Sequence, residues 1–358
     1  MGKDAISTAI NQIHTLSIRL LITGIVFMIL VSESCTQARK HIPDVSKIVV
    51  HVHIDRFDQQ FMSIDSTHIL RGLGQLNKRF PVFTDIYLED ILNYGPYSDT
   101  STILRKEVHA FITARDIRNL QKTVDTQYSE SGLNSLKQEL TRGFQFLKYY
   151  LPSYHTPRIV TFISGLNNFG AVTADSVLAI GLDMFLGKDF PPYQQISDPY
   201  PDYMLATFSR PYIVPDCFKA IEQQLYPIPE QGTLLDQIIA YGKQLYFLDQ
   251  VLPDTPDSLK IQYSSVQLDW CKQNERFIWQ FFIQNNLLYS TDMQQIMHYV
   301  GPGPSTQGMP KEAPGNIGSW IGWRIVKMYM KKHPQISLHE LLEDTDSQKI
   351  LREASYKP

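Results

Sequence analysis

Two short β-branched segments stand between long stretches of helical spacing, and this order limits the possible folds more than any other feature. The segments span 157–165 and 176–183 and are separated by turn-forming residues at 167–170. Short runs of this kind form strands, so we predict two adjacent strands of a small sheet. Before them, apolar residues recur at steps of three and four on one helical face. They are Leu133, Leu136, Leu140, Phe144 and Leu147. The sequence therefore predicts an α+β fold that is mostly helical.

The N-terminal half of the chain adds one more strand and several helices to this prediction. Alternation over 47–54 indicates a strand, and the following residues, 55–61, have the spacing of a helix. Helical spacing returns over 66–79 and 100–124. We expect most of this half to be helical.

The chain has helical spacing again from Val214 to its end. The expected amphipathic helices span 234–248, 267–287 and 316–330. The third of them carries Gly318 and Gly322 one turn apart, and small residues at this spacing let another element approach closely. In a domain outside the membrane, we interpret this pair as a packing contact.

The N-terminus has the layout of a secretory signal. A polar stretch that contains Lys3 and Arg19 precedes an apolar run over 20–31. As a helix this run would extend about 18 Å, which is short of the roughly 30 Å that a membrane span must cross. We therefore interpret 1–34 as a signal peptide, with a transmembrane helix as the alternative.

Cys35 directly follows this segment. The small residue Ser34 precedes it, and the site resembles the lipobox of bacterial lipoproteins, although Ser32 and Glu33 are unusual for one. Acyl chains on Cys35 would hold the protein on a membrane, and the polar residues 35–46 would form the tether. A secreted protein with an unmodified cysteine is the alternative.

Two further cysteines, Cys217 and Cys271, would share an oxidising compartment. One pair in a domain of this size is not a disulfide framework. We expect both to be small buried hydrophobic residues, with a disulfide between them as the alternative.

Residues 187–212 contain five prolines, too many for a regular element, so we predict a long surface loop. Its aromatic side chains either form a contact surface for a partner or pack onto their own domain. They are Phe190, Tyr193, Tyr200, Tyr203, Phe208 and Tyr212.

Charge and local motifs exclude several classes of function. The formal net charge of −3 provides no field that attracts phosphates, so nucleic acid is excluded as a partner.

His51 and His53 would share one face of a strand, but no third metal ligand stands near them. Asp55 and Asp58 are three residues apart and could act as an acid and a base, or Asp55 could stabilise a helix N-terminus.

The nearest approach to a metal-binding motif is at the C-terminal end of the chain. His339 and Glu340 are followed by Glu343, which stands where a second histidine would be needed. We interpret this segment as a short helix started by Ser337 that carries a solvated charged face.

Five segments together resemble the gliding-motility lipoprotein GldB family of Bacteroidota. They are 55–58, 181–187, 234–248, 318–326 and 355–358, and their order extends over nearly the whole mature chain. The resemblance implies an envelope lipoprotein that is needed for gliding and is linked to the secretion machinery that delivers adhesins. Its partners would be envelope motility or secretion proteins, and we expect the domain to face the periplasm.

The same segments are more distantly similar to a family of predicted zinc proteases with a gluzincin-type fold. That similarity implies a single metallopeptidase-like domain over 47–358, with a metal-binding helix after the sheet and a further ligand on the next helix. Here the first of these helices carries Asp216 and Cys217 and has no histidine, and Tyr241 stands at the place of the third ligand. Zinc hydrolysis needs three ligands and an activated water. We therefore expect a degenerate cleft without metal, cofactor or catalytic residues, and a zinc peptidase with displaced ligands is the alternative.

Overall fold

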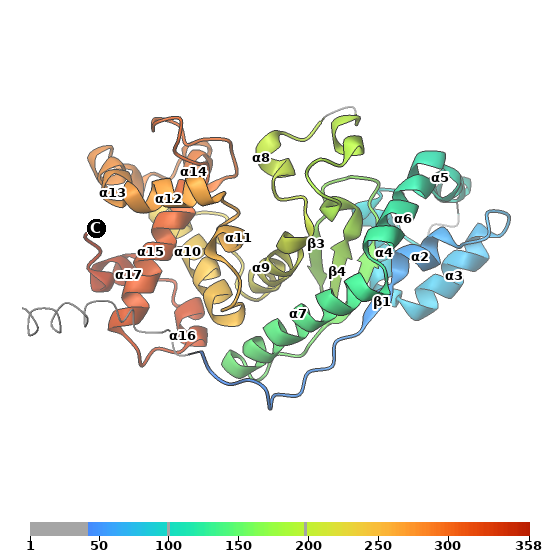
Figure 1. Cartoon of the computed structure of the whole chain (residues 1–358), viewed down its shortest axis with the longest axis horizontal. Coiled ribbons are helices and arrows are strands. Elements are labelled where there is room, and N and C mark those ends of the chain that lie inside the picture. The colour runs from blue at the N-terminus through green and yellow to red at the C-terminus, as the bar shows by residue number, and fades with distance from the viewer. Residues whose placement is uncertain (1–41, 99–100, 197–198) are drawn as a thin grey trace, which may run out of the picture. The chain divides into compact units, whose positions relative to one another are not determined.

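The sheet of this protein has four short strands (Figure 1). They are β1 (Ile54–Arg56), β2 (Arg158–Phe162), β3 (Ala171–Ala174) and β4 (Val177–Gly181), in the spatial order β1-β2-β4-β3. The first, second and fourth run parallel, and β3 pairs antiparallel with β4 at one edge. The predicted pair of adjacent strands, β2 and β4, is confirmed. Nearly all of their side chains are buried, which explains why both segments are continuous apolar runs.

The computed structural model describes residues 42–98, 101–196 and 199–358. Residues Val45–Pro358 form one compact unit that is mostly helical, as predicted. The predicted signal peptide, Cys35 and most of the tether lie outside the described residues. Within the described ranges, no helix has the length and apolar character that crossing a bilayer requires.

The first strand is shorter than predicted and begins later. Its pairing begins where Ile54 meets Ile159, because β2 itself begins only at Arg158. Among the described residues, 47–53 consequently have no strand partner, and the exposed His51 and His53 precede the strand instead of sharing one of its faces.

The segment between β1 and β2 is helical. Its elements are α2 (Phe57–Met62), α3 (Ile69–Arg79), α4 (Pro81–Ile86), the π-helical turn η1 (Tyr87–Ile91), α5 (Thr102–Thr113), α6 (Arg115–Gln127) and α7 (Glu130–Tyr150). The helix predicted over 100–124 is thus two helices, because Ala114 has an extended ψ of 131°. α7 contains the predicted apolar face, on which Leu136, Leu140 and Leu147 are fully buried.

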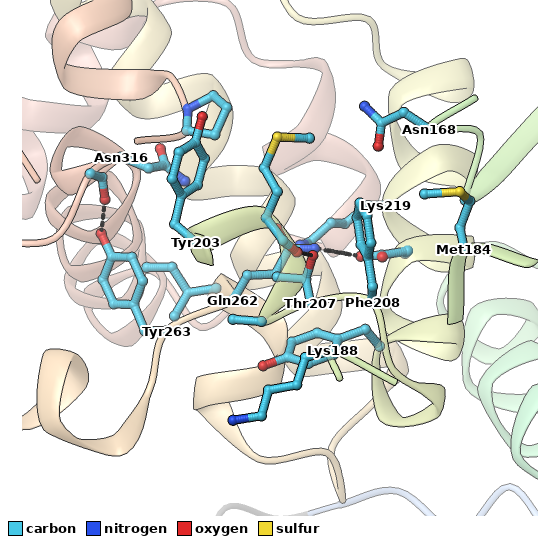
Figure 2. A pocket seen from close by; sticks show the side chains of 18 of the residues that line it. Asn168, Met184, Lys188, Tyr203, Thr207, Phe208, Lys219, Gln262, Tyr263 and Asn316 are labelled. Carbon is cyan, nitrogen blue, oxygen red and sulfur yellow. Dashed lines mark hydrogen bonds and ion pairs between the residues drawn. The ribbon is translucent and has the colours of Figure 1, made fainter. Parts of the chain in front are cut away.

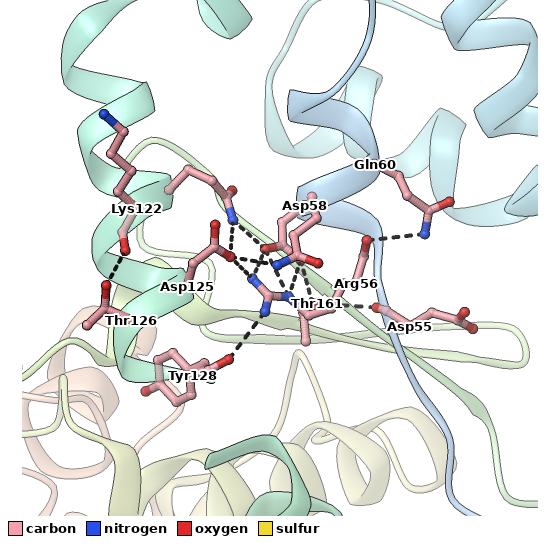
Figure 3. A network of polar contacts seen from close by, with 11 residues as sticks. Asp55, Arg56, Asp58, Gln60, Lys122, Asp125, Thr126, Tyr128 and Thr161 are labelled. Atoms are coloured by element: carbon pink, nitrogen blue, oxygen red, sulfur yellow. Dashed lines mark hydrogen bonds and ion pairs between the residues drawn. The ribbon is translucent and has the colours of Figure 1, made fainter. Parts of the chain in front are cut away.

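A polar network joins the start of α2 to the sheet and to α6 (Figure 3). Asp58 is completely buried, and its carboxylate accepts hydrogen bonds from Arg56, from Gln121 at 2.8 Å and from Thr161 at 2.6 Å. The Arg56 guanidinium also donates to Asp125 at 2.6 Å and to the carbonyl of Tyr128 at 3.3 Å. A buried ion pair with this many further hydrogen bonds fixes the position of α6 against the sheet.

Asp55 lies on β1, so the interpretation of this residue as a helix N-terminal carboxylate is wrong. Burial acts to raise the pKa of Asp55, but hydrogen bonds from Arg158 and Arg79 outweigh it and hold that pKa below its usual value. Asp58, in contrast, is in the first turn of α2.

Three long helices dominate the C-terminal half: α9 (Ile213–Leu225), α10 (Leu234–Val251) and α15 (Ile317–Lys332). The predicted close approach at Gly322 is confirmed. A Cβ atom on Gly322 would lie 1.8 Å from the carbonyl oxygen of Ile238, and one on Gly242 would lie 2.3 Å from the backbone of Gly322. The backbones of α10 and α15 therefore touch where these two glycines meet.

Shorter helices complete this half. They are α11 (Asp257–Ile261), α12 (Ser265–Gln273), α13 (Glu275–Gln284), η5 (Leu287–Tyr289), α14 (Met293–Val300), α16 (Leu338–Glu343) and α17 (Ser347–Ala354). The single helix predicted over 267–287 is broken at Asn274, whose side chain donates to the carbonyl of Trp270 at 2.9 Å. Ser337 caps α16 as predicted, in a capping box with Glu340.

Candidate binding cavity

A cavity of about 700 Å³ lies among β3, α9, the segment 187–212, α11 and the loop 301–316 (Figure 2). In Figure 2, Asn168 and Met184 stand on one side of it, and Tyr263 and Asn316 stand on the opposite side. The segments that line it are far apart in the sequence. The cavity is therefore a product of the tertiary fold.

The edge strand β3 contributes main-chain groups to this cavity. Gly181 donates to the carbonyl of Gly170, and this bond sets the alternation along the antiparallel pair. By that alternation, the N–H and C=O groups of Ala171 and Thr173 point away from β4. Within the described residues they have no hydrogen-bond partner, and Ala171 itself lines the cavity. An open strand edge of this kind can pair with another extended chain.

Amide side chains make up much of the polar lining. Each presents both a donor and an acceptor, as a peptide group does. These residues are Asn168, Gln223, Gln262, Gln267 and Asn316.

Asp216 and Lys219 form a charged pair in the wall of the cavity. The Asp216 carboxylate accepts from Gln262 at 2.8 Å and lies 3.6 Å from the Lys219 ammonium. Burial raises the pKa of Asp216, although the nearby Lys219 and the hydrogen bond from Gln262 oppose this shift. Burial also lowers the pKa of Lys219, against the attraction of Asp216. Both charged forms are therefore costly in this cavity, and additional hydrogen bonds from an occupant would stabilise them.

Apolar side chains complete the lining and can cover the side chains of an occupant. They are Met184, Phe185, Met204, Phe208 and Ile261. Tyr263 lines the cavity as well, but its hydroxyl is already engaged, because it donates to the carbonyl of Gly315 at 2.7 Å.

The aromatic residues of 187–212 divide into two groups. This segment forms short turns and one helix: η3 (Pro191–Gln194), α8 (Asp202–Leu205) and η4 (Arg210–Tyr212). Tyr193 is fully buried and donates to the carbonyl of Asp183 at 2.7 Å, and Tyr200 donates to the carbonyl of Leu166 at 2.6 Å. Phe208 is nearly buried, while Tyr203 and Tyr212 are half-buried and line the cavity. Phe190 is half-buried against Tyr193.

The structure separates the three predicted cleft residues. Asp216 lines the cavity, whereas Cys217, one position later on α9, is fully buried. Tyr241 is half-buried on α10. Among the residues described, neither Cys217 nor Tyr241 lines the cavity. Cys217 and Cys271 are both buried and unpaired, so the alternative of a disulfide between them is wrong.

The loop after β2 shapes one end of the cavity, and the sequence did not single it out. Gly165, Leu166 and Asn168 all have positive φ angles, of 74°, 68° and 62°. The buried Asp183, on η2 (Leu182–Phe185), holds the loop by accepting bonds from the N–H groups of Ser164 and Leu166, each at 2.9 Å. Burial raises the pKa of Asp183 to about 6, because these hydrogen bonds only partly offset the loss of water.

In the part of the chain that the structure describes, no group of three His, Cys, Asp or Glu side chains is placed to hold a metal ion. His339 and Glu343 are exposed on α16, and their side chains approach to 3.4 Å. They form the charged surface that was predicted for this helix.

The family model for the gliding motility protein GldB matches residues 38–358. The chain belongs to the GldB family. Membership makes it a gliding-motility-related lipoprotein, and it confirms the family that the five segments indicated. None of the curated proteins and none of the solved structures compared is similar to this GldB-family chain.

Proposed function

We propose that this GldB-family lipoprotein acts in the gliding apparatus by holding an extended segment of another envelope protein, without catalysing a reaction on it. The unpaired edge of β3, of which Ala171 lines the cavity, is the observation that carries this proposal. An extended segment that added to the edge would satisfy the outward N–H and C=O groups of Ala171 and Thr173. The amide side chains around the edge would bond to the remaining peptide groups of that segment.

We also propose where in the cell this site lies. A lipid on Cys35 would anchor the chain to a membrane, and the folded unit would face the periplasm. Its partners would be components of the motility or secretion machinery, whose segments could reach a cavity in that compartment. We expect the protein to be required for gliding.

We further propose that the scaffold is of the metallopeptidase type. Two arrangements support this. A small sheet precedes α9 in the chain, and α9 packs on both the edge strand β3 and the next long helix, α10. On this scaffold, the residues of α9 that line the cavity are Asp216, Lys219, Ala220 and Gln223. This set offers a single carboxylate as a metal ligand, whereas zinc hydrolysis uses three protein ligands.

A proline at position 171 tests the proposed binding mode. Ala171→Pro removes one outward N–H and leaves the bonds to β4 in place, because the N–H of residue 171 does not take part in that ladder. Cells that carry this variant should lose spreading motility. The matched control Ala171→Ser keeps the N–H and should spread normally.

The amount of variant protein in the envelope and its melting temperature must match those of the wild type for the comparison to hold. Normal spreading by a folded Ala171→Pro variant would contradict edge-strand binding. Stoichiometric zinc in the purified protein, together with peptide hydrolysis, would contradict the non-catalytic role.

A further inference from the structure

A second cavity, of about 590 Å³, lies on another face of α9, toward the C-terminal end of that helix. It is bounded by the C-terminal part of α9, the loop 226–233, α10, α16 and the start of α17. No residue that lines it also lines the cavity beside β3. The two cavities are therefore separate sites.

A buried carboxylate faces this second cavity. Glu222 lines it, yet the residue is only 2% exposed. One carboxylate oxygen, Oε2, accepts from Gln244 at 2.9 Å. Among the described residues, no hydrogen bond reaches the other oxygen, Oε1. Burial disfavours the charged carboxylate, and a ligand in the cavity that donated to this oxygen would stabilise it.

The charges around Glu222 favour a cation. Asp236 and Glu343 also line the cavity, and Lys243 is the single basic residue among the described lining residues. The Lys243 ammonium already donates to the carbonyl of Asp344. Burial raises the pKa of Glu222 to about 7 and lowers the pKa of Lys243, so the protein itself stabilises each charge only in part. An added positive charge beside Glu222 would stabilise its ionised form.

An ammonium on an apolar stem fits this site. Gln244 already donates to one oxygen of Glu222, and one further donor at the other oxygen would complete the hydrogen bonds of the carboxylate. A primary ammonium needs only one acceptor at this position. Leu225, Ile239 and Leu342 line the same cavity and can cover a chain of methylene groups.

We propose that this cavity binds a lysine side chain of a partner protein, with the lysine ammonium donating to Glu222. The lysine stem lies against the apolar lining, and Tyr226 and Pro229 also line the cavity. The site adds a second contact on a different face of α9 from the one that lines the first cavity. It does not depend on the occupant of the first cavity.

Binding of blocked tripeptides to the full-length protein in detergent tests this site. The probe has a central lysine between two glycines, and its matched control has norleucine in place of lysine. Isothermal titration should show about tenfold tighter binding of the lysine peptide, as expected for one charge-assisted hydrogen bond. Equal affinities for the two peptides would overturn the proposal.

Three substitutions locate the effect. Glu222→Gln keeps the size of the side chain and should reduce the affinity for the lysine peptide to that of the norleucine peptide. Glu343 is exposed on α16, so we expect Glu343→Gln to leave the fold intact. Because it removes one surface charge near the site, it should weaken lysine binding by about twofold. Asp216→Asn, in the first cavity, should leave the preference for lysine unchanged. A preference for lysine that survives Glu222→Gln would overturn the assignment.

The source of the ammonium is tested with n-butylamine, which has the same head and stem without a peptide. We expect n-butylamine to bind more weakly than the lysine peptide, because it has no peptide groups that could contact the protein around the site. Affinity equal to that of the peptide would show a site for free amines and would contradict a protein partner.

Discussion

The polar residues around Asp58 and those around Asp216 differ in how many of their hydrogen-bonding groups are already used. Asp58 is completely buried, and both of its oxygens accept bonds from neighbours on β2, α6 and its own segment (Figure 3). Around Asp216, the amide side chains, Lys219 and the edge of β3 keep unused donors and acceptors (Figure 2). The first cluster stabilises the fold, and the second is prepared for an occupant.

Removing the carboxylate at position 58 should have the largest effect on stability. Asp58→Ala leaves the largely buried Arg56 guanidinium without its main partner and Thr161 without an acceptor. We expect a loss of about 3–5 kcal/mol in the free energy of unfolding, measured by denaturant titration. Asp58→Asn, which keeps an acceptor for Thr161, should lose less. If Asp58→Ala unfolds at the wild-type denaturant concentration, the proposed division between the clusters fails.

Asp183 stands between these two cases, because one of its oxygens is saturated and Oδ1 is buried without a partner among the described residues. Burial raises the pKa of Asp183 to about 6 in the folded protein, from an ordinary value of 3.8. A raised folded-state pKa means that its contribution to stability is fully present below pH 4 and is lost as the pH rises to 6. The difference corresponds to roughly 3 kcal/mol.

Asp183→Asn should remove this part of the pH dependence. Unfolding free energies at pH 4 and pH 7 would be compared between the variant and the wild type, so that the other titrating groups cancel. Parallel pH profiles for the two proteins would show that Asp183 does not titrate in this range.

The smallest effect on stability is expected in the cavity. Asp216→Asn keeps an acceptor for Gln262 and removes a charge whose burial is unfavourable, so the free energy of unfolding should change by less than about 1 kcal/mol. Spreading motility should nevertheless decrease, because the charged pair with Lys219 is lost from the binding surface. A variant with lower stability and normal spreading would place Asp216 with Asp58, as a structural residue.

The sheet could be predicted from the sequence where its strands are buried on both faces. β2 and β4 consist of apolar β-branched residues, and this composition is a local signal. β3 gave no such signal, because its four residues, Ala171–Ala174, are held by pairing with β4 at the edge. The start of β1 was misplaced for a related reason, since it depends on where β2 begins.

The cavity was predictable only in part. The resemblance to zinc proteases indicated Asp216, which does line the cavity. The same resemblance indicated Cys217, which is fully buried, and Tyr241, which is half-buried on α10, and neither is among the described residues that line the cavity. Gln262 and Asn316 come from distant segments, and the sequence alone gives no reason to place them together. The positive φ of Leu166 has no sequence signature either, because its conformation is imposed by the contact with Asp183.

The helix α9 lines both cavities, the one beside β3 through Asp216 and the other through Glu222. With thirteen residues it is a rod about 20 Å long, too short to bend appreciably. Lys219 and Gln223 line the first cavity, and Glu222 and Leu225 line the second, so two faces of one short helix serve the two cavities. A substitution that displaces α9 should therefore weaken the binding of both proposed partner segments.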